Sequence, residues 1–197
     1  GFAGVSWPKD YGGQGYGPEF RLVWSEECAR AEISPYMNFQ GFVLAGGAIL
    51  KYGTEEQKQK YLPDMAAGKL IGCFGLTEAD FGSNPGGMLT KAVEDGDHYV
   101  LNGSKYWITN GSTCQVAIVW AKLNGVIRGF LIDSDTPGFT GKQIKNKFSL
   151  RASDTSELVL EDCRIAKSHM ISSEPPRIAC ILKDRWNFSI RLPMPVR

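Results

Sequence analysis

The sequence has no long apolar run and no excess of one charge. The longest apolar candidate, residues 42–50, contains two glycines and is far shorter than the roughly 20 residues that a helix needs to cross a bilayer. Against 22 Lys and Arg stand 21 Asp and Glu, which gives a net charge of +1. We therefore expect neither a membrane-spanning helix nor an electrostatic surface for nucleic acid.

Histidine is scarce, and the cysteines form no metal motif. The chain holds two histidines, His98 and His169, and five cysteines, of which no two stand at the spacing of metal ligands. A zinc site is therefore not expected. Because the cysteines are odd in number and scattered, we interpret them as small buried apolar side chains in a protein of a reducing compartment.

What the chain does contain is an ordinary globular composition. Its 197 residues are 43% apolar and 22% charged, which suffices for one or two domains with a core. The chain begins at Gly1 without a methionine, so we expect it to begin inside a domain and leave targeting open. Residues 171–197 hold four prolines and show no apolar period, which predicts a loosely docked tail or, alternatively, a segment that binds a partner.

Residues 1–69 are predicted to be helical with loops. Glycine and proline dominate residues 1–17, which indicates a loop. Pro18 suits the first turn of a helix, and apolar residues then recur at helical spacing over residues 19–31. A second helix, with small residues that would let another backbone come close, is predicted over about residues 39–50.

A third helix has clear start and stop signals. Thr54 and Gln57 form a capping box, in which each residue bonds the backbone N–H of the other. Pro63 is expected to end or restart this helix. Gly68 is a plausible residue for its C-terminal stop.

From about residue 70 the pattern changes to short apolar strands with tight turns. Two Asn-Gly dipeptides, Asn102-Gly103 and Asn124-Gly125, are typical of type I′ hairpin turns. The strands that they would join lie at 98–101 with 104–108 and at 115–121 with 126–132. Residues 70–166 are therefore predicted to form a small antiparallel β-barrel or sandwich.

Two segments of this β region combine apolar bulk with hydroxyls and glycines. They are Cys73 to Asn84 and Tyr106 to Asn110. A flat aromatic cofactor with a polar edge needs such a wall, because aromatic side chains stack on its faces while hydroxyls and N–H groups bond its rim. Taken singly, Phe74 and Trp107 would more often be core aromatics, and Thr77 a strand residue. The two segments together favour the cofactor wall.

These segments resemble the flavin-binding signature of the acyl-CoA dehydrogenase family, and the resemblance extends from Gly4 to Met170. It implies an α+β fold, with an incomplete helical N-terminal domain at 1–69, a flavin-facing β domain at 70–170 and a divergent tail at 171–197. The helical C-terminal domain of the family has no counterpart in the sequence. Further similar stretches are Trp7-Pro8, Tyr11-Gly12-Gly13, residues 52–58, 61–63 and 148–155.

The resemblance implies that FAD binds along the first segment. Phe74 would lie near the edge of the flavin ring or the substrate, and Gly75 and Leu76 would present backbone groups to the pyrimidine end. Thr77 would donate its hydroxyl toward the reactive part of the ring. Such a donor would stabilise the negative charge that arrives with the hydride.

The remaining site residues are also implied by the resemblance. Gly82 would permit a close backbone approach, and Ser83 corresponds to a family serine that touches both the cofactor and the acyl-CoA, which makes it the predicted substrate-binding residue. In the second segment, Trp107 would cover one face of the ring, with Ile108 beside it, and Thr109 would bond the rim.

No catalytic residue is assigned to this chain, because the family's glutamate base belongs to the missing domain. Glu78 lies in the flavin loop and is interpreted as a carboxylate that stabilises the loop. Ala79 and Asn84 replace a family proline and aspartate.

Two strands resemble the glutaryl-CoA dehydrogenase branch, at residues 127–131 and 147–153. Residues 34–36, however, lack the arginine that would hold the distal carboxylate of a glutaryl group, which argues against that substrate.

The resemblance thus implies α,β-dehydrogenation of an acyl-CoA thioester, with FAD as cofactor, electron-transfer flavoprotein as electron acceptor, and a homo-oligomer at full length. This chain alone is expected to be inactive. The alternatives are a non-enzymatic truncated relative, an acyl-CoA oxidase that uses oxygen, and an unrelated β-sandwich binding module. The expected setting is fatty acid or amino acid catabolism, in the mitochondrial matrix of a eukaryote or the cytoplasm of a bacterium.

Overall fold

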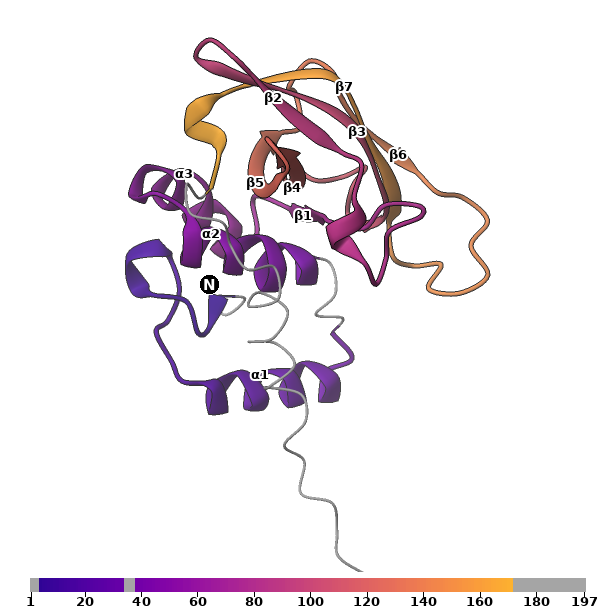
Figure 1. Cartoon of the computed structure of the whole chain (residues 1–197). Helices are drawn as coiled ribbons and strands as arrows, with labels where there is room; N and C mark the ends of the chain where they lie inside the picture. The colour runs from indigo at the N-terminus through magenta and orange to yellow at the C-terminus, as the bar shows by residue number, and fades with distance from the viewer. Residues whose placement is uncertain (1–3, 34–37, 172–197) are drawn as a thin grey trace, which may run out of the picture.

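The computed structural model describes residues 4–33 and 38–171, and in this part of the chain the helices precede the strands (Figure 1). Residues 34–36 and the predicted tail, apart from Ile171, lie outside it. The elements are α1 (Pro18–Arg30), α2 (Gly46–Tyr52), α3 (Glu55–Ala66), β1 (Gly72–Gly75), β2 (Lys91–Asp95), β3 (His98–Thr109), β4 (Val116–Leu123), β5 (Val126–Asp133), β6 (Phe139–Gln143) and β7 (Thr155–Ala166).

Helix α3 starts and stops where the sequence indicates. The N–H of Gln57 donates to the Thr54 hydroxyl at 3.3 Å, and the N–H of Thr54 donates to the Gln57 side chain at 3.0 Å, which completes the capping box. Gly68 has a φ of +74° and donates to the carbonyl of Met65 at 2.9 Å, as a C-terminal stop requires. Pro63, in contrast, lies inside the helix without ending it.

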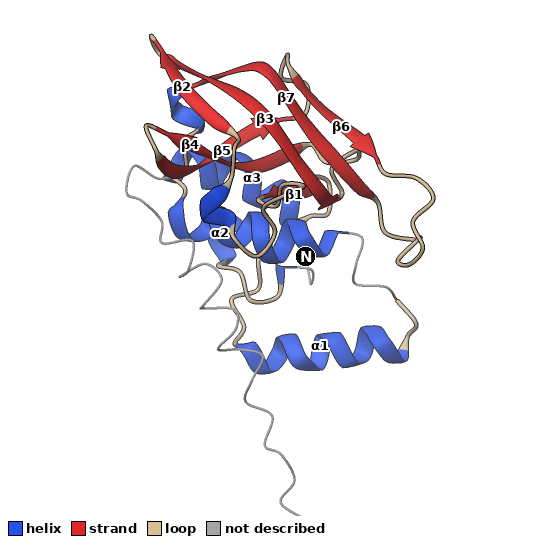
Figure 2. Ribbon diagram, turned by 45° about the vertical axis from the view of Figure 1, so that its right-hand side comes forward, coloured by secondary structure: helices blue, strands red, loops and turns tan. Residues whose placement is uncertain are grey.

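The other two helices differ from expectation in detail. The predicted second helix is present, but its first part, Gly41–Ala45, is π-helical and runs directly into α2. Helix α1 has nearly the predicted bounds, yet Cys28 is its one buried residue, and Phe20 is 50% exposed. Figures 1 and 2 both show α1 apart from α2 and α3.

The strands form one mixed, curled sheet, so the prediction of an antiparallel barrel or sandwich is wrong in two respects (Figure 2). Strand β4 pairs in parallel with both β1 and β2 and antiparallel with β5, whereas β2, β3, β7 and β6 follow one another antiparallel. Among the described residues β5 and β6 do not pair with each other, so the barrel is open. Turn dipeptides identify only strands that are neighbours in sequence, and β1 and β4 are not.

The predicted hairpin at Asn102-Gly103 is also wrong. Strand β3 runs through this dipeptide without turning, and its register with β7 shifts between Leu101 and Gly103. Gly103 has a φ of +142°, and a Cβ there would lie 2.7 Å from the Cα of Thr90, so the glycine marks a bulge with a close backbone approach. The hairpin turn lies earlier instead: it joins β2 to β3 and contains Gly96, whose φ is +57°.

The second Asn-Gly prediction is confirmed. Asn124 and Gly125 have φ values of +51° and +79°, as a type I′ turn requires, and they join β4 to β5.

Strand β4 is buried on both faces and separates two apolar cores. Because successive side chains point to opposite faces, its near-continuous apolar sequence serves both. Inside the curled sheet, Ala117, Val119 and Ala121 pack with residues such as Leu101, Phe130 and Leu158. On the other face, Val116, Ile118 and Trp120 pack with Ala45, Ile49, Tyr61 and Met65 from the helices.

Polar contacts also join α3 to the sheet. The Gln57 side chain donates to the carbonyls of Ser168 at 2.6 Å and Met170 at 3.1 Å. The Tyr61 hydroxyl donates to Asp133 at 2.9 Å. Helices and sheet are thus held together by a shared core and by directed hydrogen bonds.

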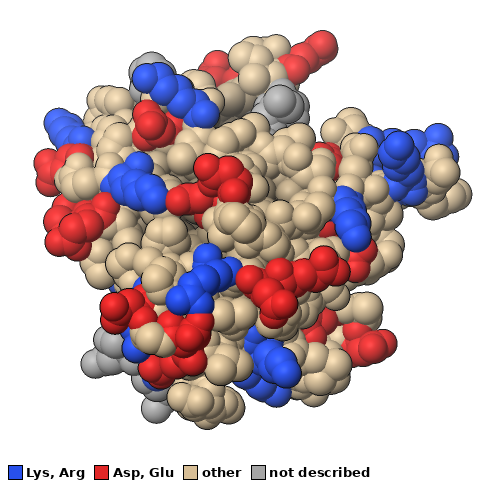
Figure 3. All heavy atoms as spheres, turned by 90° about the horizontal axis from the view of Figure 1, so that it is seen from above, with Lys and Arg blue, Asp and Glu red and all other residues tan. Residues whose placement is uncertain are grey.

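Membrane spans, metal clusters and cysteines can be examined in the described residues. None of the helices within residues 4–33 and 38–171 has the length and apolar character to cross a membrane, and no three metal-ligating side chains cluster there. The four cysteines in these ranges are free and buried, and burial raises the pKa of Cys163 to about 11. Figure 3 shows acidic and basic side chains interspersed over the face that it presents.

Candidate functional site

The two motifs that the sequence singled out lie side by side. The N–H of Tyr106 in β3 donates to the carbonyl of Thr77, just past the end of β1, at 2.8 Å. One residue away, the ammonium of Lys105 donates to the carbonyl of Leu76 at 3.3 Å. The fold therefore brings the end of β1 against β3 directly beside Trp107.

The first segment passes from the core to the surface. The Phe74 ring is half-buried and lies 5.9 Å from the ring of Trp120. Gly75 is buried, and a Cβ there would lie 3.0 Å from a methyl of Leu158, so the packing favours glycine. Leu76 and Thr77 are half-buried at the point where the strand leaves the core.

Trp107 stands out in backbone and in exposure. Its φ is +62°, in the left-handed region, and it lies where the β3–β7 register shifts between Lys105 and Ile108. Such a conformation costs a bulky residue about 1–3 kcal/mol and persists only where the surroundings enforce it. The side chain is 57% exposed, with its ring edge-on to Tyr106 at 4.9 Å. More than half of the Trp107 side chain is thus open to a ligand, while Ile108 is buried.

Three hydroxyls of the predicted site are free to bind a ligand. Within the described part of the chain, the side chains of Thr77, Ser83 and Thr109 take part in no hydrogen bond. Gly82 and Ser83 lie on an exposed loop, and a Cβ at Gly82 would meet nothing within 4 Å, so protein packing does not require that glycine.

These observations fit a flavin. An exposed indole offers a flat apolar surface, and free hydroxyls on the same two segments offer donors for a polar rim, which is the combination that a flavin needs. The roles of the individual residues toward the cofactor stay predictions.

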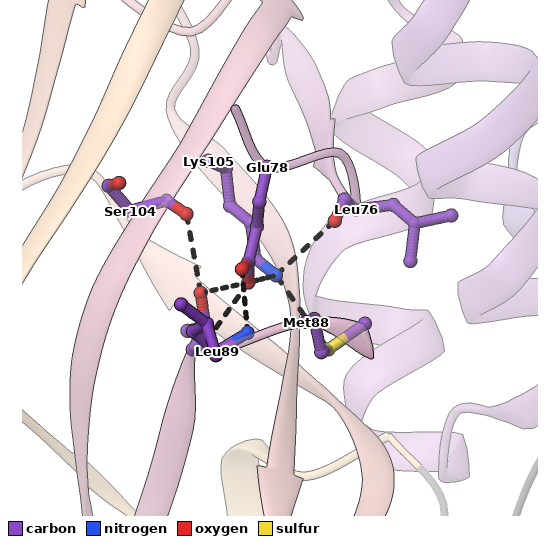
Figure 4. Close-up of polar contacts among 7 residues, drawn as sticks. Leu76, Glu78, Met88, Leu89, Ser104 and Lys105 are labelled. Carbon is purple, nitrogen blue, oxygen red and sulfur yellow. Dashed lines mark hydrogen bonds and ion pairs between the residues drawn. The ribbon is translucent and has the colours of Figure 1, made fainter. Parts of the chain in front are cut away.

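We use the name wall for the four residues Thr77, Ser83, Trp107 and Thr109, which come from the end of β1, the loop after it and β3. Behind it lies a buried ion pair that sequence reasoning missed (Figure 4). The Lys105 ammonium donates to Glu78 Oε1 at 2.8 Å, and the exposed fractions of the two side chains are 0% and 8%.

Glu78 is fully occupied by donors. It accepts from the N–H of Leu89 at 2.6 Å, from the N–H of Thr90 at 3.0 Å and from the Thr90 hydroxyl at 2.6 Å. Burial raises the pKa of Glu78, but the hydrogen bonds from Leu89, Lys105 and Thr90 outweigh it and lower the pKa to about 2. Burial lowers the pKa of Lys105, and Glu78 opposes that shift. The carboxylate is therefore ionised and paired, which supports its interpretation as a loop-stabilising group.

A hollow of about 280 Å³ lies beside this pair and does not include Thr77 or Trp107. It is open to the surface and is formed by the loop after β1 and by the bulge of β3. Its lining residues are Glu78, Ala79, Asp80, Phe81, Leu89, Thr90, Gly103 and Ser104.

Asp154 fixes the segment that follows Thr109. The Ser112 hydroxyl donates to its carboxylate at 3.0 Å, and the N–H of Asn110 donates to its carbonyl at 3.2 Å. Sequence reasoning placed Asp154 in a stretch similar to the family but gave it no role. The second of the two sequence segments, Tyr106 to Asn110, is thus anchored at both ends, by Lys105 before it and by Asp154 after it.

Comparisons with known proteins agree with this fold. The N-terminal domain model of the acyl-CoA dehydrogenases matches residues 1–69, and the middle domain model matches residues 73–163. A probable acyl-CoA dehydrogenase of Bacillus subtilis is 38% identical over 178 residues, which are 87% of this chain and 47% of that protein. The chain thus spans about half the length of the curated relatives it matches.

Solved structures are similar as well. An acyl-CoA dehydrogenase from Geobacillus kaustophilus has a TM-score of 0.84 and 32% identity, with 94% of this chain and 50% of that chain covered. A glutaryl-CoA dehydrogenase from Mycobacterium smegmatis in complex with FADH2 has a TM-score of 0.68 and 54% identity over 70% of this chain and 36% of that chain. Because the two family models follow one another along the chain in the order of its helices and its sheet, and together cover most of it, the chain belongs to the acyl-CoA dehydrogenase family.

Proposed function

We propose that this chain forms the flavin-facing part of an enzyme that oxidises the Cα–Cβ bond of an acyl-CoA thioester. The observation that supports this most is that the segment with the exposed Trp107 and the free Thr109 hydroxyl is hydrogen-bonded, through Tyr106, to Thr77, whose hydroxyl is also free. FAD, when bound, supplies the acceptor for the hydride from the substrate's β-carbon.

The chain's own residues would bind and orient the two reactants. Trp107 covers a face of the cofactor, and Thr77 and Thr109 donate hydrogen bonds to its rim, where developing negative charge is stabilised without reorganisation. Ser83, on the exposed loop, contacts both the cofactor and the acyl-CoA. Trp107 and Thr109 lie on β3, and a position on a rigid strand suits these roles because it fixes the groups in advance.

Removal of the α-proton requires a base that the wall does not supply. Glu78 is excluded because its carboxylate already accepts from Leu89, Thr90 and Lys105 and has a pKa of about 2. We therefore assign that step to a part of the protein beyond this chain's wall. Electron-transfer flavoprotein is the proposed electron acceptor, and a homo-oligomer the proposed assembly.

FAD titration of the chain tests the proposal. We expect saturable quenching of flavin fluorescence and an affinity about tenfold weaker for Trp107→Ala, because an aromatic stack contributes about 0.5–1.5 kcal/mol. Tyr16→Ala is the matched control, since Tyr16 is also an exposed aromatic but lies in the entry to α1, away from the sheet. A chain that stays colourless with excess FAD would instead favour a non-enzymatic relative.

The electron acceptor needs a separate assay, on the whole protein with an acyl-CoA substrate. Reduction of an added electron-transfer flavoprotein without peroxide supports a dehydrogenase. Stoichiometric hydrogen peroxide in air would identify an oxidase.

A further inference from the structure

The buried ion pair joins three segments that carry the wall. Glu78 follows Thr77 directly, and Lys105 precedes Trp107 by two residues in β3. From its buried position the Lys105 ammonium donates both to Glu78, at 2.8 Å, and to the carbonyl of Leu76, at 3.3 Å. One cation therefore fixes the end of β1 and the start of the following loop against β3 (Figure 4).

The carboxylate closes that loop. Glu78 stands at the start of residues 78–90, and its donors Leu89 and Thr90 stand at the end. The Thr90 hydroxyl also donates to the carbonyl of Ser104, at 3.3 Å, which returns the network to β3. Ser83 lies in the middle of this closed loop, so its position depends on the same carboxylate.

Stability alone does not explain such a pair. Removing two charges from water is unfavourable, and a well-packed apolar pair of similar volume is often equally or more stable. What the pair supplies in addition is direction, because its hydrogen bonds reach backbone groups of three segments in a fixed geometry.

We propose that Lys105 and Glu78 are positioning residues, which hold the end of β1, the loop 78–90 and β3 in the one arrangement where the residues of the wall face a common ligand. The flavin as that ligand rests on the proposed function. The positioning itself can be measured without it.

The decisive variant is the neutral pair Lys105→Met with Glu78→Gln, compared with each single change. Each single variant leaves one buried charge without its partner, so we expect it to unfold at a lower temperature, and the double variant to recover part of that loss. Ile165→Ala, buried near the end of β7 and paired with Tyr99, is the control for stability loss elsewhere in the sheet.

Amide hydrogen exchange of the full chain measures the positioning. In the double variant we expect exchange to rise about tenfold over residues 76–90 and 104–109 and to stay unchanged in β4 and β5. In metal sites the loss of supporting partners costs about 10–100-fold in affinity or activity, so we expect FAD affinity also to fall about tenfold. The Ile165→Ala control should keep its FAD affinity at equal or lower thermal stability.

The possible outcomes distinguish the positioning role of Lys105 and Glu78 from the proposed flavin function. If amide exchange over residues 76–90 and 104–109 is as slow in the double variant as in the wild type, the positioning role is overturned. Faster exchange in a protein that binds no FAD even as wild type would support the positioning role and sink the flavin function. Faster exchange with unchanged FAD affinity would show that the wall does not depend on this pair, and would also overturn the proposal.

Discussion

Strands β3 and β4 lie two places apart in the same sheet and are built in opposite ways. Strand β4 pairs with β5 through eight consecutive residues without a shift, and its buried side chains are apolar. Strand β3 contains two register shifts, two residues with positive φ, Gly103 and Trp107, and the buried ammonium of Lys105. The candidate site lies on the irregular strand, as expected where function overrides local regularity.

The largest effect is expected in the regular strand. Trp120 is fully buried between β4 and the helices, so Trp120→Ala should lower the free energy of unfolding by about 3–5 kcal/mol. Urea denaturation measures this loss. In molecules that remain folded the FAD affinity should fall less than it does for Trp107→Ala, since Trp120 reaches the site only through its contact with the Phe74 ring. An equal loss of affinity would contradict the different roles of the two strands.

Acid should affect the irregular strand next. The pKa of Glu78 is about 2 in the folded state against 4.5 as the reference, so its contribution is present above pH 4.5 and is lost as the pH falls toward 2. A shift of this size corresponds to about 3 kcal/mol. Glu78→Gln should therefore flatten the pH dependence of the unfolding free energy between pH 5 and 2, whereas the exposed Glu161→Gln should not.

Gly103→Ala tests the bulge of β3. The new methyl group would meet Thr90 at 2.7 Å on a backbone with φ of +142°, and strain of this kind costs about 1–3 kcal/mol. Thermal unfolding should detect the loss. Gly125→Ala is the comparison in the regular hairpin, because it shares a positive φ of +79° but meets nothing within 4 Å. Equal losses would mean that the contact with Thr90 is unimportant.

The smallest expected change in the free energy of unfolding is an increase, whereas most substitutions lower it. Trp107→Gly removes a bulky residue from a φ of +62°, so we expect the free energy of unfolding to rise by up to about 1 kcal/mol while FAD affinity falls. Trp107→Ala, which keeps a Cβ, separates the relief of strain from the loss of the ring. A Trp107→Gly chain less stable than Trp107→Ala would show that the backbone there is not strained.

The regular parts of the fold could be predicted because their signals are local. The capping box at Thr54 and the turn at Asn124-Gly125 involve residues close in sequence, and both are confirmed. Asn102-Gly103 carries the same dipeptide signal, but there the glycine serves a close approach to Thr90, next to the Lys91–Asn102 pair of the β2–β3 ladder, and the dipeptide alone does not reveal that pairing. The parallel pairing of β1 with β4 is likewise non-local.

In the site, the residues of the wall could be named from the motifs, but their support could not. Once a turn was assumed at residues 102–103, the alternation that places Lys105 inward was lost, and its pairing with Glu78 was missed. The exposed face of Trp107 follows from a bulge that pattern alone does not show. The structure does bring the two motifs into contact, because the N–H of Tyr106 donates to the carbonyl of Thr77.

Because β4 is buried on both of its faces, the protein should not be divisible into separate fragments. The family models divide the chain near residue 70, yet Val116, Ile118 and Trp120 on the sheet share one core with Ile49 and Met65 on the helices. If the chain were cut at that boundary, each of the two fragments would expose a broad apolar surface and should precipitate. Experiments on the sheet therefore need a chain that still contains the helices, because the helices cover one apolar face of the sheet.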